Sequence, residues 1–294
     1  MIKCLYYPGC SQKGTSISYE KSFLALCPLL GIETTELADW NCCGTTAAIS
    51  LNKLLSTVLT ARNLALAESM NLPLVTPCPG CYLSFKRVNN IFQDDISYAR
   101  KVNGVLSEED LNYLGKVKVY HLLEFVIKEI GLERIKEKVR VPLQGLKIAP
   151  YYGCQISRPY ASGDDLYNPQ NMDRLIEALG AEAVDFPSRT QCCGGALMIT
   201  QKKAALAMSR KILDNIKKTD ADLIVTPCGL CQFNLQTAQQ RGKKIPVLNI
   251  TQLLGIAFDL NKKDIQFDKN PLIAKVKAKT PLTVDGVHKG EYHV

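Results

Sequence analysis

The sequence predicts an α/β protein that consists of two repeats, each a parallel β-sheet flanked by helices. Two observations support this fold class. Short apolar segments with strand character alternate with longer segments of helical periodicity along most of the chain, and this alternation is typical of parallel sheets. In addition, a set of cysteines occurs twice in the same order, which indicates that the chain contains two copies of one domain.

The repeated cysteine set has the same layout in both copies. A single cysteine comes first, an adjacent pair followed by glycine comes second, and a Cys-x-x-Cys motif comes last. Ten of the twelve cysteines belong to these two sets. The first set consists of Cys10, Cys42, Cys43, Cys78 and Cys81, and the second consists of Cys154, Cys192, Cys193, Cys228 and Cys231. The last four members keep a constant offset between the copies, whereas the gap after the single cysteine is longer in the second copy.

Strands and helices are expected to alternate in the first repeat. The apolar segment at 2–9 predicts a buried strand that carries Cys10 at its carboxyl end. Leucines recur at helical spacing between Ile49 and Met70 and predict one long helix. The other strands are expected at 32–38, 72–75 and 117–120, and the other helices at about 16–30, from the Cys-x-x-Cys motif through Val88, and at 122–130.

The second repeat predicts the same alternation. Its strands are expected at 146–151, 183–186, 223–225 and 245–248, and its helices at about 170–179, 202–218 and 251–258. Every cysteine of the two sets follows a predicted strand. Because ligands of open parallel sheets bind beyond the carboxyl ends of the strands, each set is expected to gather at one edge of its sheet.

Chain length and the repeat together indicate two domains, because 294 residues suffice for two cores. We place the first domain at 1–143, the second at 144–262 and a lysine-rich C-terminal tail at 263–294. The tail is expected to wrap over a neighbouring surface or to be partly disordered. The polar segment at 93–116 has no counterpart in the second repeat. We interpret it as a surface excursion, and docking to a partner subunit is the alternative.

Composition places the chain among ordinary soluble globular proteins, with 46% hydrophobic and 22% charged residues. The net charge of +8 is moderate and no basic-aromatic module accompanies it, so nucleic-acid binding is not expected. The N-terminus lacks the pattern of a signal peptide, and no apolar segment approaches the roughly 20 residues of a membrane span. We therefore expect a cytoplasmic protein whose cysteines serve metal binding or catalysis rather than disulfides.

Five cysteines on three loops exceed the four ligands that a zinc ion or a cubane iron–sulfur cluster requires. Both members of an adjacent pair can reach one core only if the chain bends sharply, which Gly44 and Gly194 would permit. The thiolates of each Cys-x-x-Cys motif would be stabilised by the N-terminus of a helix. These features favour an iron–sulfur assembly of non-standard shape in each set. Two structural zinc ions, or one cluster and one zinc ion, are the alternatives.

The succession of one cysteine, Cys-Cys-Gly and Cys-x-x-Cys, present twice, resembles the cysteine-rich CCG family. Over essentially all of residues 1–260 the chain resembles the B subunit of the soluble heterodisulfide reductase of methanogenic archaea. Related CCG subunits serve lactate, glycolate, glycerol-phosphate and succinate oxidoreductases, and several of them carry a fused ferredoxin segment. This chain has no Cys-x-x-Cys-x-x-Cys run that would form such a segment, which favours the heterodisulfide reductase subunit.

The resemblance implies that each set of five cysteines holds a non-cubane [4Fe-4S] cluster. The ten cysteines would then be the cofactor ligands and, through the clusters, the catalytic residues. It also implies that the clusters face each other across a cleft at a pseudo-twofold axis. In the last step of methanogenesis, the heterodisulfide of coenzyme M and coenzyme B would be split there, with one electron from each cluster and each sulfur transiently bound to an iron.

Breaking a disulfide takes two electrons, and no Gly-x-Gly-x-x-Gly or P-loop pattern occurs, so we expect the electrons to come from another polypeptide. The resemblance implies three partners: the flavin-bearing A subunit that performs electron bifurcation, the ferredoxin-like C subunit, and a hydrogenase or formate dehydrogenase. The alternative function is an electron-relay subunit of a lactate, glycolate or succinate oxidoreductase complex, which would pass electrons on without cleaving a bond.

The heterodisulfide carries a sulfonate, a phosphate and a carboxylate, and such groups are bound by cationic or amide donors. One or two of the basic residues near the cysteine loops are therefore expected to contact it. These residues are Lys13, Lys86, Arg87, Arg158 and Arg189. Candidates for the proton donor are water, Tyr7 and Tyr151.

The remaining cysteines and histidines are interpreted as structural. Cys4 and Cys27 lie outside both sets, within a predicted strand and a predicted helix, and are expected to be small buried hydrophobic residues. His121 opens an apolar helix and is expected to be structural. His288 and His293 are too sparse for a metal site.

Overall fold

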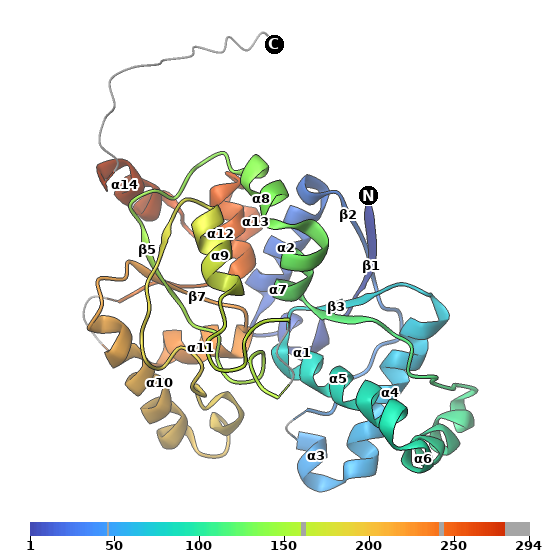
Figure 1. Ribbon diagram of the computed structural model, residues 1–294. Coiled ribbons are helices and arrows are strands. Elements are labelled where there is room, and N and C mark those ends of the chain that lie inside the picture. The colour runs from blue at the N-terminus through green and yellow to red at the C-terminus, as the bar shows by residue number, and fades with distance from the viewer. Residues whose placement is uncertain (46, 160–162, 241–243, 280–294) are drawn as a thin grey trace.

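Two four-stranded parallel sheets form the framework of the protein, one in each repeat (Figure 1). The computed structural model describes residues 1–45, 47–159, 163–240 and 244–279. In the view of Figure 1 the first repeat lies on the right and the second on the left, with a group of helices between them.

The first sheet has the strand order β2-β1-β3-β4. Its strands are β1 (Ile2–Tyr6), β2 (Ile32–Glu36), β3 (Leu74–Thr76) and β4 (Val119–His121). All neighbouring strands are parallel, and at the carboxyl end of the sheet Thr76 pairs with His121. Strand β3 is buried along its whole length, as expected for a parallel strand that is covered on both faces.

The second sheet repeats this topology with the order β6-β5-β7-β8. Its strands are β5 (Lys147–Pro150), β6 (Glu182–Ala183), β7 (Leu223–Thr226) and β8 (Val247–Asn249). Thr226 pairs with Asn249 at the carboxyl end, in the same register as Thr76 and His121 in the first sheet. The predicted fold class of two related parallel-sheet repeats is therefore confirmed.

Helices connect the strands in both repeats. Those of the first half are α1 (Gly9–Gln12), α2 (Ile17–Leu30), α3 (Ala47–Leu51), α4 (Lys53–Ser69), α5 (Pro79–Asp94), α6 (Ile96–Leu106), η1 (Ser107–Glu109), α7 (Leu122–Phe125), the π-helical η2 (Val126–Ile130) and α8 (Leu132–Lys138). Those of the second half are α9 (Asn171–Ala178), η3 (Gly195–Leu197), α10 (Lys202–Lys217), α11 (Gly229–Ala238), α12 (Ile250–Ala257), α13 (Lys262–Ile265) and α14 (Asn270–Lys279).

The long helix expected at 49–70 is interrupted, so the prediction of one helix was wrong at this point. Asn52 has an extended backbone between α3 and α4, and its side-chain oxygen accepts a hydrogen bond from the backbone N–H of Leu55 at 3.0 Å. Asparagine is a preferred N-cap residue because it satisfies an N–H group that has no partner within the helix. The leucine spacing continues across the break and conceals it in the sequence.

The segment at 93–116 is more than a surface excursion. Helix α6 packs against α4 and α5. Its Val102 and Leu106, together with Tyr113 further along, are buried in a core of the first repeat. The segment therefore closes one side of the core of the first repeat. The corresponding core of the second repeat forms without such a segment. Docking of this segment to a partner stays a prediction.

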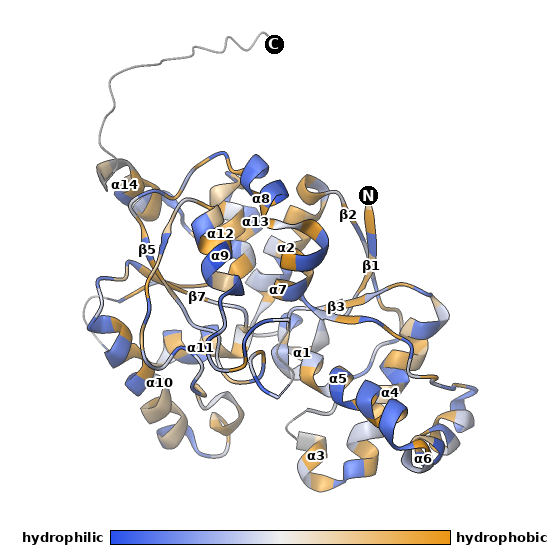
Figure 2. Ribbon diagram, in the orientation of Figure 1, coloured by the Kyte–Doolittle hydropathy of each residue, from blue (hydrophilic) through white to orange (hydrophobic). Residues whose placement is uncertain are grey.

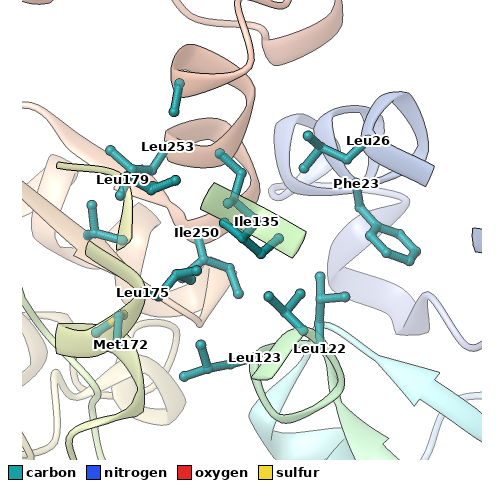
Figure 3. Close-up of a cluster of buried hydrophobic side chains, with 14 of the residues drawn as sticks. Phe23, Leu26, Leu122, Leu123, Ile135, Met172, Leu175, Leu179, Ile250 and Leu253 are labelled. Carbon is teal, nitrogen blue, oxygen red and sulfur yellow. The ribbon is translucent and has the colours of Figure 1, made fainter. Parts of the chain in front are cut away.

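The largest hydrophobic core is shared by the two repeats. Figure 3 shows Leu26 and Leu123 of the first half pointing toward Leu175 and Leu253 of the second half. Each repeat also has a smaller core of its own. Outer helices such as α4 and α10 carry both hydrophilic and hydrophobic residues, as surface helices do (Figure 2). Because the main core includes both halves, burial of apolar surface fixes one sheet relative to the other.

The first part of the C-terminal tail is packed. Leu272 and Val276 of α14 are buried in the shared core, and Lys275 forms an ion pair with Asp222. Residues 280–294, which include His288 and His293, lie outside the described residues. The domain boundaries after residues 143 and 262 stay predictions.

Candidate functional site

Both cysteine sets lie at the carboxyl ends of the strands, as predicted. Cys10 follows β1 within α1, and Cys154 follows β5. The adjacent pairs follow β2 and β6. Each Cys-x-x-Cys motif begins a helix directly after the third strand of its repeat, with Cys78 as the N-cap residue of α5 and Cys228 as that of α11. Three separate loops thus converge on each set.

All five cysteines of the first set line one cavity of about 330 Å³. The Sγ atoms of Cys43 and Cys81 lie 3.3 Å apart in its buried part. Cys10 and Cys42 are exposed at its rim. The remaining lining consists of small or neutral residues of the loops, which are Ser11, Gly14, Thr15, Thr45, Gly80, Gln155, Cys228 and Leu230.

All five cysteines of the second set line a smaller cavity of about 70 Å³. The Sγ atoms of Cys193 and Cys231 lie 3.4 Å apart, which repeats the geometry of Cys43 and Cys81. Cys192 is exposed at the rim. The same three loops of the fold therefore bring together the same five positions in each repeat.

The two cavities adjoin, because Gln155, Cys228 and Leu230 line both of them. The starts of α5 and α11 also pack against the opposite repeat. A Cβ atom added at Gly80 would lie 3.0 Å from Oε1 of Gln155, and one added at Gly229 would overlap Ser16. Glycine at both positions allows this close approach. The two cysteine sets consequently face each other across the interface between the repeats.

The bend at each cysteine pair is made by a glycine with positive φ, as the sequence predicted. The φ angles are 72° at Gly44 and 79° at Gly194, a region that favours glycine. The backbone of each cysteine pair is held by a hydroxyl group of the next long helix, α4 in the first repeat and α10 in the second. Thr60 donates to the carbonyl of Cys43 at 2.7 Å, and Ser209 donates to the carbonyl of Cys193 at 2.8 Å.

Tyr7 and Tyr151 position the paired cysteines. The hydroxyl of Tyr7 donates to the carbonyl of Asn41 at 2.8 Å, and that of Tyr151 donates to the carbonyl of Gln191 at 2.6 Å. Burial, reinforced by nearby cysteines, raises the pKa of both phenols above the ordinary range. Each hydroxyl proton is donated to a carbonyl group in this structure, and the role of Tyr7 or Tyr151 as proton donor stays a prediction.

Neighbouring sulfurs strongly influence each other's protonation. A hydrogen bond from the Cys154 thiol, together with the backbone N–H groups after the pair, lowers the pKa of Cys192 to about 6. Hydrogen bonds from Cys42 and Cys81 hold the pKa of Cys43 well below its ordinary value. The same sulfur–sulfur hydrogen bonds raise the pKa of Cys81 and Cys154, so in each set some thiols lose their proton more readily while their neighbours keep theirs. Thiolates are the metal-binding form of cysteine.

None of the five basic residues singled out from the sequence lines either cavity, and their contact with substrate anions stays a prediction. Lys13 forms ion pairs with Glu20 and Glu36. Arg189 is buried in ion pairs with Asp173 and Asp185. The other three point elsewhere: Arg158 donates to the Thr190 carbonyl, Arg87 donates to Ser56, and Lys86 lines a separate groove.

The residues expected to be structural are buried. Cys4 and Cys27 are 1% and 4% exposed, in agreement with their interpretation as small hydrophobic residues. His121 is fully buried, and its Nδ1 accepts a hydrogen bond from the backbone N–H of Leu123 at 3.0 Å as the N-cap of α7. Gln155 was missed at the sequence level, although its position directly after Cys154 is a usable signal.

The cysteine sets fit a core larger than one metal ion. A structural zinc site brings four ligands to about 2.0–2.3 Å from one point. In each repeat, five sulfurs from three loops instead surround a cavity. Such an arrangement suits a polynuclear iron–sulfur core, which cysteine thiolates bind. The geometry thus favours clusters over zinc.

The chain belongs to the cysteine-rich domain family CCG, whose model matches residues 4–86 and 148–236. It is 34% identical over 278 residues to the 8-methylmenaquinol:fumarate reductase membrane anchor subunit of Wolinella succinogenes, covering 92% of this chain and 96% of the relative. It is 33% identical over 279 residues to a protein of Archaeoglobus profundus that is named as similar to the B subunit of heterodisulfide reductase, with 90% and 93% covered.

A further relative is the B subunit of the ferredoxin:CoB-CoM heterodisulfide reductase of Methanosarcina mazei, which is 30% identical over 282 residues, with 92% of this chain and 94% of the relative covered. The resemblance to heterodisulfide reductase B subunits is therefore confirmed. A crystal structure of a hypothetical protein from Helicobacter pylori has a similar fold, with a TM-score of 0.72 at 16% identity. The similarity covers 90% of this chain and 50% of that chain, so this chain spans half of that protein.

A helix that crosses a bilayer needs about 20 mostly apolar residues. In the part of the chain that the structure describes, no helix combines the length and the apolar character that crossing a membrane requires.

Proposed function

We propose that this chain is the catalytic subunit of an oxidoreductase complex that reduces a disulfide to two thiols at two non-cubane [4Fe-4S] clusters. The coenzyme M–coenzyme B heterodisulfide is the proposed substrate, in the last step of methanogenesis. The observation that carries this proposal is that two complete five-cysteine sets line adjoining cavities with a shared wall. A disulfide placed at that wall lies within reach of both sets.

Each proposed cluster has its own ligands. Cys10, Cys42, Cys43, Cys78 and Cys81 hold the first cluster, and Cys154, Cys192, Cys193, Cys228 and Cys231 hold the second. When bound, the clusters supply one-electron chemistry, and two of them match the two electrons that a disulfide takes up.

The protein contributes the shape and the neutrality of the space between the sets. Gln155 and Leu230 form the common wall, and the amide of Gln155 can donate a hydrogen bond to a sulfur or accept one from a thiol product. Among the described residues, the lining of both cavities contains no Lys or Arg. The cavities therefore suit the disulfide itself, and the anionic ends of the heterodisulfide extend beyond them.

Partners follow from the same proposal. The chain works with the flavin-bearing A subunit and the ferredoxin-like C subunit, and a hydrogenase or formate dehydrogenase supplies electrons in a bifurcating complex in the cytoplasm. Support comes from relatives that are named as subunits of multi-component reductases.

A second candidate is an electron-relay subunit of a lactate, glycolate, succinate or fumarate oxidoreductase complex. It is favoured by the 34% identity to one component of a fumarate reductase. The neutral lining is consistent with a relay, because no charged substrate has to be bound.

Turnover separates the two candidates. The complex, purified anaerobically with all its iron, is given reduced viologen and the heterodisulfide, and thiol release is followed. The proposal expects two thiols per two electrons consumed. Full iron content without thiol release, together with reduction of fumarate or oxidation of lactate, glycolate or succinate, would establish the relay instead. A Cys27→Ala complex serves as the control, because that thiol lies outside both sets.

A further inference from the structure

The segment that leads into the single cysteine of each set differs between the repeats at one position. It reads Tyr7-Pro8-Gly9-Cys10 in the first repeat and Tyr151-Tyr152-Gly153-Cys154 in the second. The two glycines have positive φ angles of 68° and 73°, and the first tyrosine of each segment donates to the backbone before the cysteine pair. Proline against tyrosine at the second position is therefore what distinguishes two otherwise equivalent segments.

Tyr152 lines the second cavity, whereas Pro8 does not line the first. The tyrosine is 2% exposed and belongs to the shared hydrophobic core. The cavity beside it measures about 70 Å³, against about 330 Å³ in the first repeat. A large aromatic ring thus forms part of the wall of the narrower site, and the equivalent residue of the first repeat takes no part in the wider one.

Hydrogen bonds hold the phenol of Tyr152 in place. It donates to Oδ2 of Asp173 at 2.6 Å and accepts from the backbone N–H of Met172 at 2.7 Å. Asp173 is in turn ion-paired with Arg189, whose guanidinium lies over the tyrosine ring at 5.2 Å from its centroid. Both charged residues are buried, and separating a buried ion pair is strongly unfavourable. The ring therefore cannot leave the wall without breaking these contacts.

In the described part of the first repeat, different residues occupy the equivalent positions of this network. Asp39 stands three residues before Cys42, just as Arg189 stands three residues before Cys192. The side chain of Asp39 is 76% exposed and forms an ion pair with Arg62 of α4. Because this ion pair lies at the surface, it holds no aromatic ring beside the first cavity.

We propose that Tyr152 is an access-determining residue whose ring narrows the second cysteine site, with Asp173 and Arg189 as positioning residues that hold the ring there. This inference rests on the proposed function, in which each site holds a cluster, and it assigns the unequal access to the two clusters to one side chain. The second cluster then loses iron to a small chelator more slowly than the first. Tyr152 itself does not bind iron.

Substitutions at Tyr152 separate its ring from its hydroxyl. Tyr152→Leu removes the ring, and Tyr152→Phe keeps the ring but loses the hydrogen bond to Asp173. Phe258→Leu is the matched control, because Phe258 is a buried aromatic residue of the same core that lines neither cavity. A general loosening of the core would affect both leucine variants, whereas the proposal expects an effect in Tyr152→Leu alone.

The anaerobic holoprotein is treated with an iron chelator, and the cysteines that are freed are alkylated and identified by mass spectrometry. In wild type, Cys43 should react before Cys193, although both are 4% exposed. Tyr152→Leu should speed the reaction of Cys193 about tenfold and leave Cys43 unchanged, because no buried ring has to be displaced. Tyr152→Phe should speed it about threefold through the lost hydrogen bond. Phe258→Leu should react like wild type.

The positioning role of Asp173 has its own test in the same assay. Asp173→Ala should match Tyr152→Phe, and Asp173→Asn, which keeps an acceptor for the phenol, should stay closer to wild type. An unchanged rate at Cys193 in both Tyr152 variants, or an equal rise in Phe258→Leu, would overturn the proposal.

Failure of this inference and failure of the proposed function are distinguishable. If the wild-type complex binds no clusters, the proposed function fails, and alkylation of the full chain without chelator still compares Cys43 with Cys193 in every variant. If the wild-type complex holds its iron but both cysteines react at equal rates, the clusters stand and the role of Tyr152 does not.

Discussion

The two repeats present the same five cysteines in cavities of different openness. In the first repeat the cavity measures about 330 Å³ and Cys10 and Cys42 are exposed. In the second repeat it measures about 70 Å³ and Cys192 is the exposed member, while Cys228 is buried. Topology and loop order are shared, so the difference arises from the packing around the loops rather than from the ligand set.

Because of this difference, solvent molecules and ligands reach the two cysteine sets to different degrees. A ligand or electron donor that approaches from solvent meets the first set over a wider opening. In the second set only Cys192 is exposed, and its cavity shares Gln155 and Leu230 with that of the first set. The two repeats thus share the pattern of five cysteines but differ in how far these cysteines are exposed to solvent.

The largest expected effect comes from removing one buried sulfur in each repeat. Cys43→Ser and Cys193→Ser should each lower the iron content of the anaerobic protein from about eight to about four atoms, because each takes a ligand from one set. Iron and acid-labile sulfide analysis measures this. Cys27→Ala should keep the full content. Loss of all iron from either serine variant would contradict a separate core in each set.

Substitution of the glycine after each pair sharpens the comparison. Gly44→Ala and Gly194→Ala should both cost about 1–2 kcal/mol in the free energy of unfolding, because alanine is strained at positive φ. Gly194→Ala should cost about 1–3 kcal/mol more through overpacking, since its Cβ would lie 2.8 Å from Cα of Ala205. The nearest atom to a Cβ at Gly44 is 3.3 Å away. Denaturant unfolding that ranks the variants the other way would refute this account of the packing.

A titratable residue distinguishes the strand ends of the two repeats. Burial lowers the pKa of His121 to about 4 from 6.5. Between these pH values the unfolded chain binds a proton that the folded chain does not, so stability should fall as the pH falls, by about 3 kcal/mol in total. Asn249 makes no such contribution. Denaturation at pH 7 and pH 5 should show a smaller difference for His121→Gln than for wild type, and equal differences would argue against this assignment.

The smallest effect is expected for the paired tyrosines. Tyr7→Phe and Tyr151→Phe should each cost about 1 kcal/mol in the free energy of unfolding through one lost hydrogen bond, with iron content and turnover retained. Thermal unfolding and thiol release of the two variants check this. Loss of turnover at full iron content would instead identify these hydroxyls as proton donors.

The sequence was sufficient to predict the elements that depend on local pattern. Repeated cysteines after apolar segments located both sites at the strand ends, because parallel topology gathers such loops at one edge. The break at Asn52 could not be seen, since capping depends on one side chain within an unbroken leucine pattern. Strand β6 is also shorter than expected, because only Glu182 and Ala183 pair with β5.

Contacts between the repeats could not be predicted. That Gln155 lines both cavities, or that Tyr19 donates to the carbonyl of Pro227, depends on how two sheets pack through a shared core. Basic residues near the cysteines in sequence, such as Arg189, turned away to acidic partners because a buried guanidinium needs compensation. Closeness in sequence to a cysteine of the two sets therefore did not predict that a basic residue lines the cavity.

The most direct test of the central claim is an anaerobic crystal structure of the assembled protein, with iron located by anomalous scattering. We expect two groups of about four irons each, one within each five-cysteine set, facing each other across Gln155 and Leu230. Two isolated zinc ions, or iron in one set alone, would contradict it.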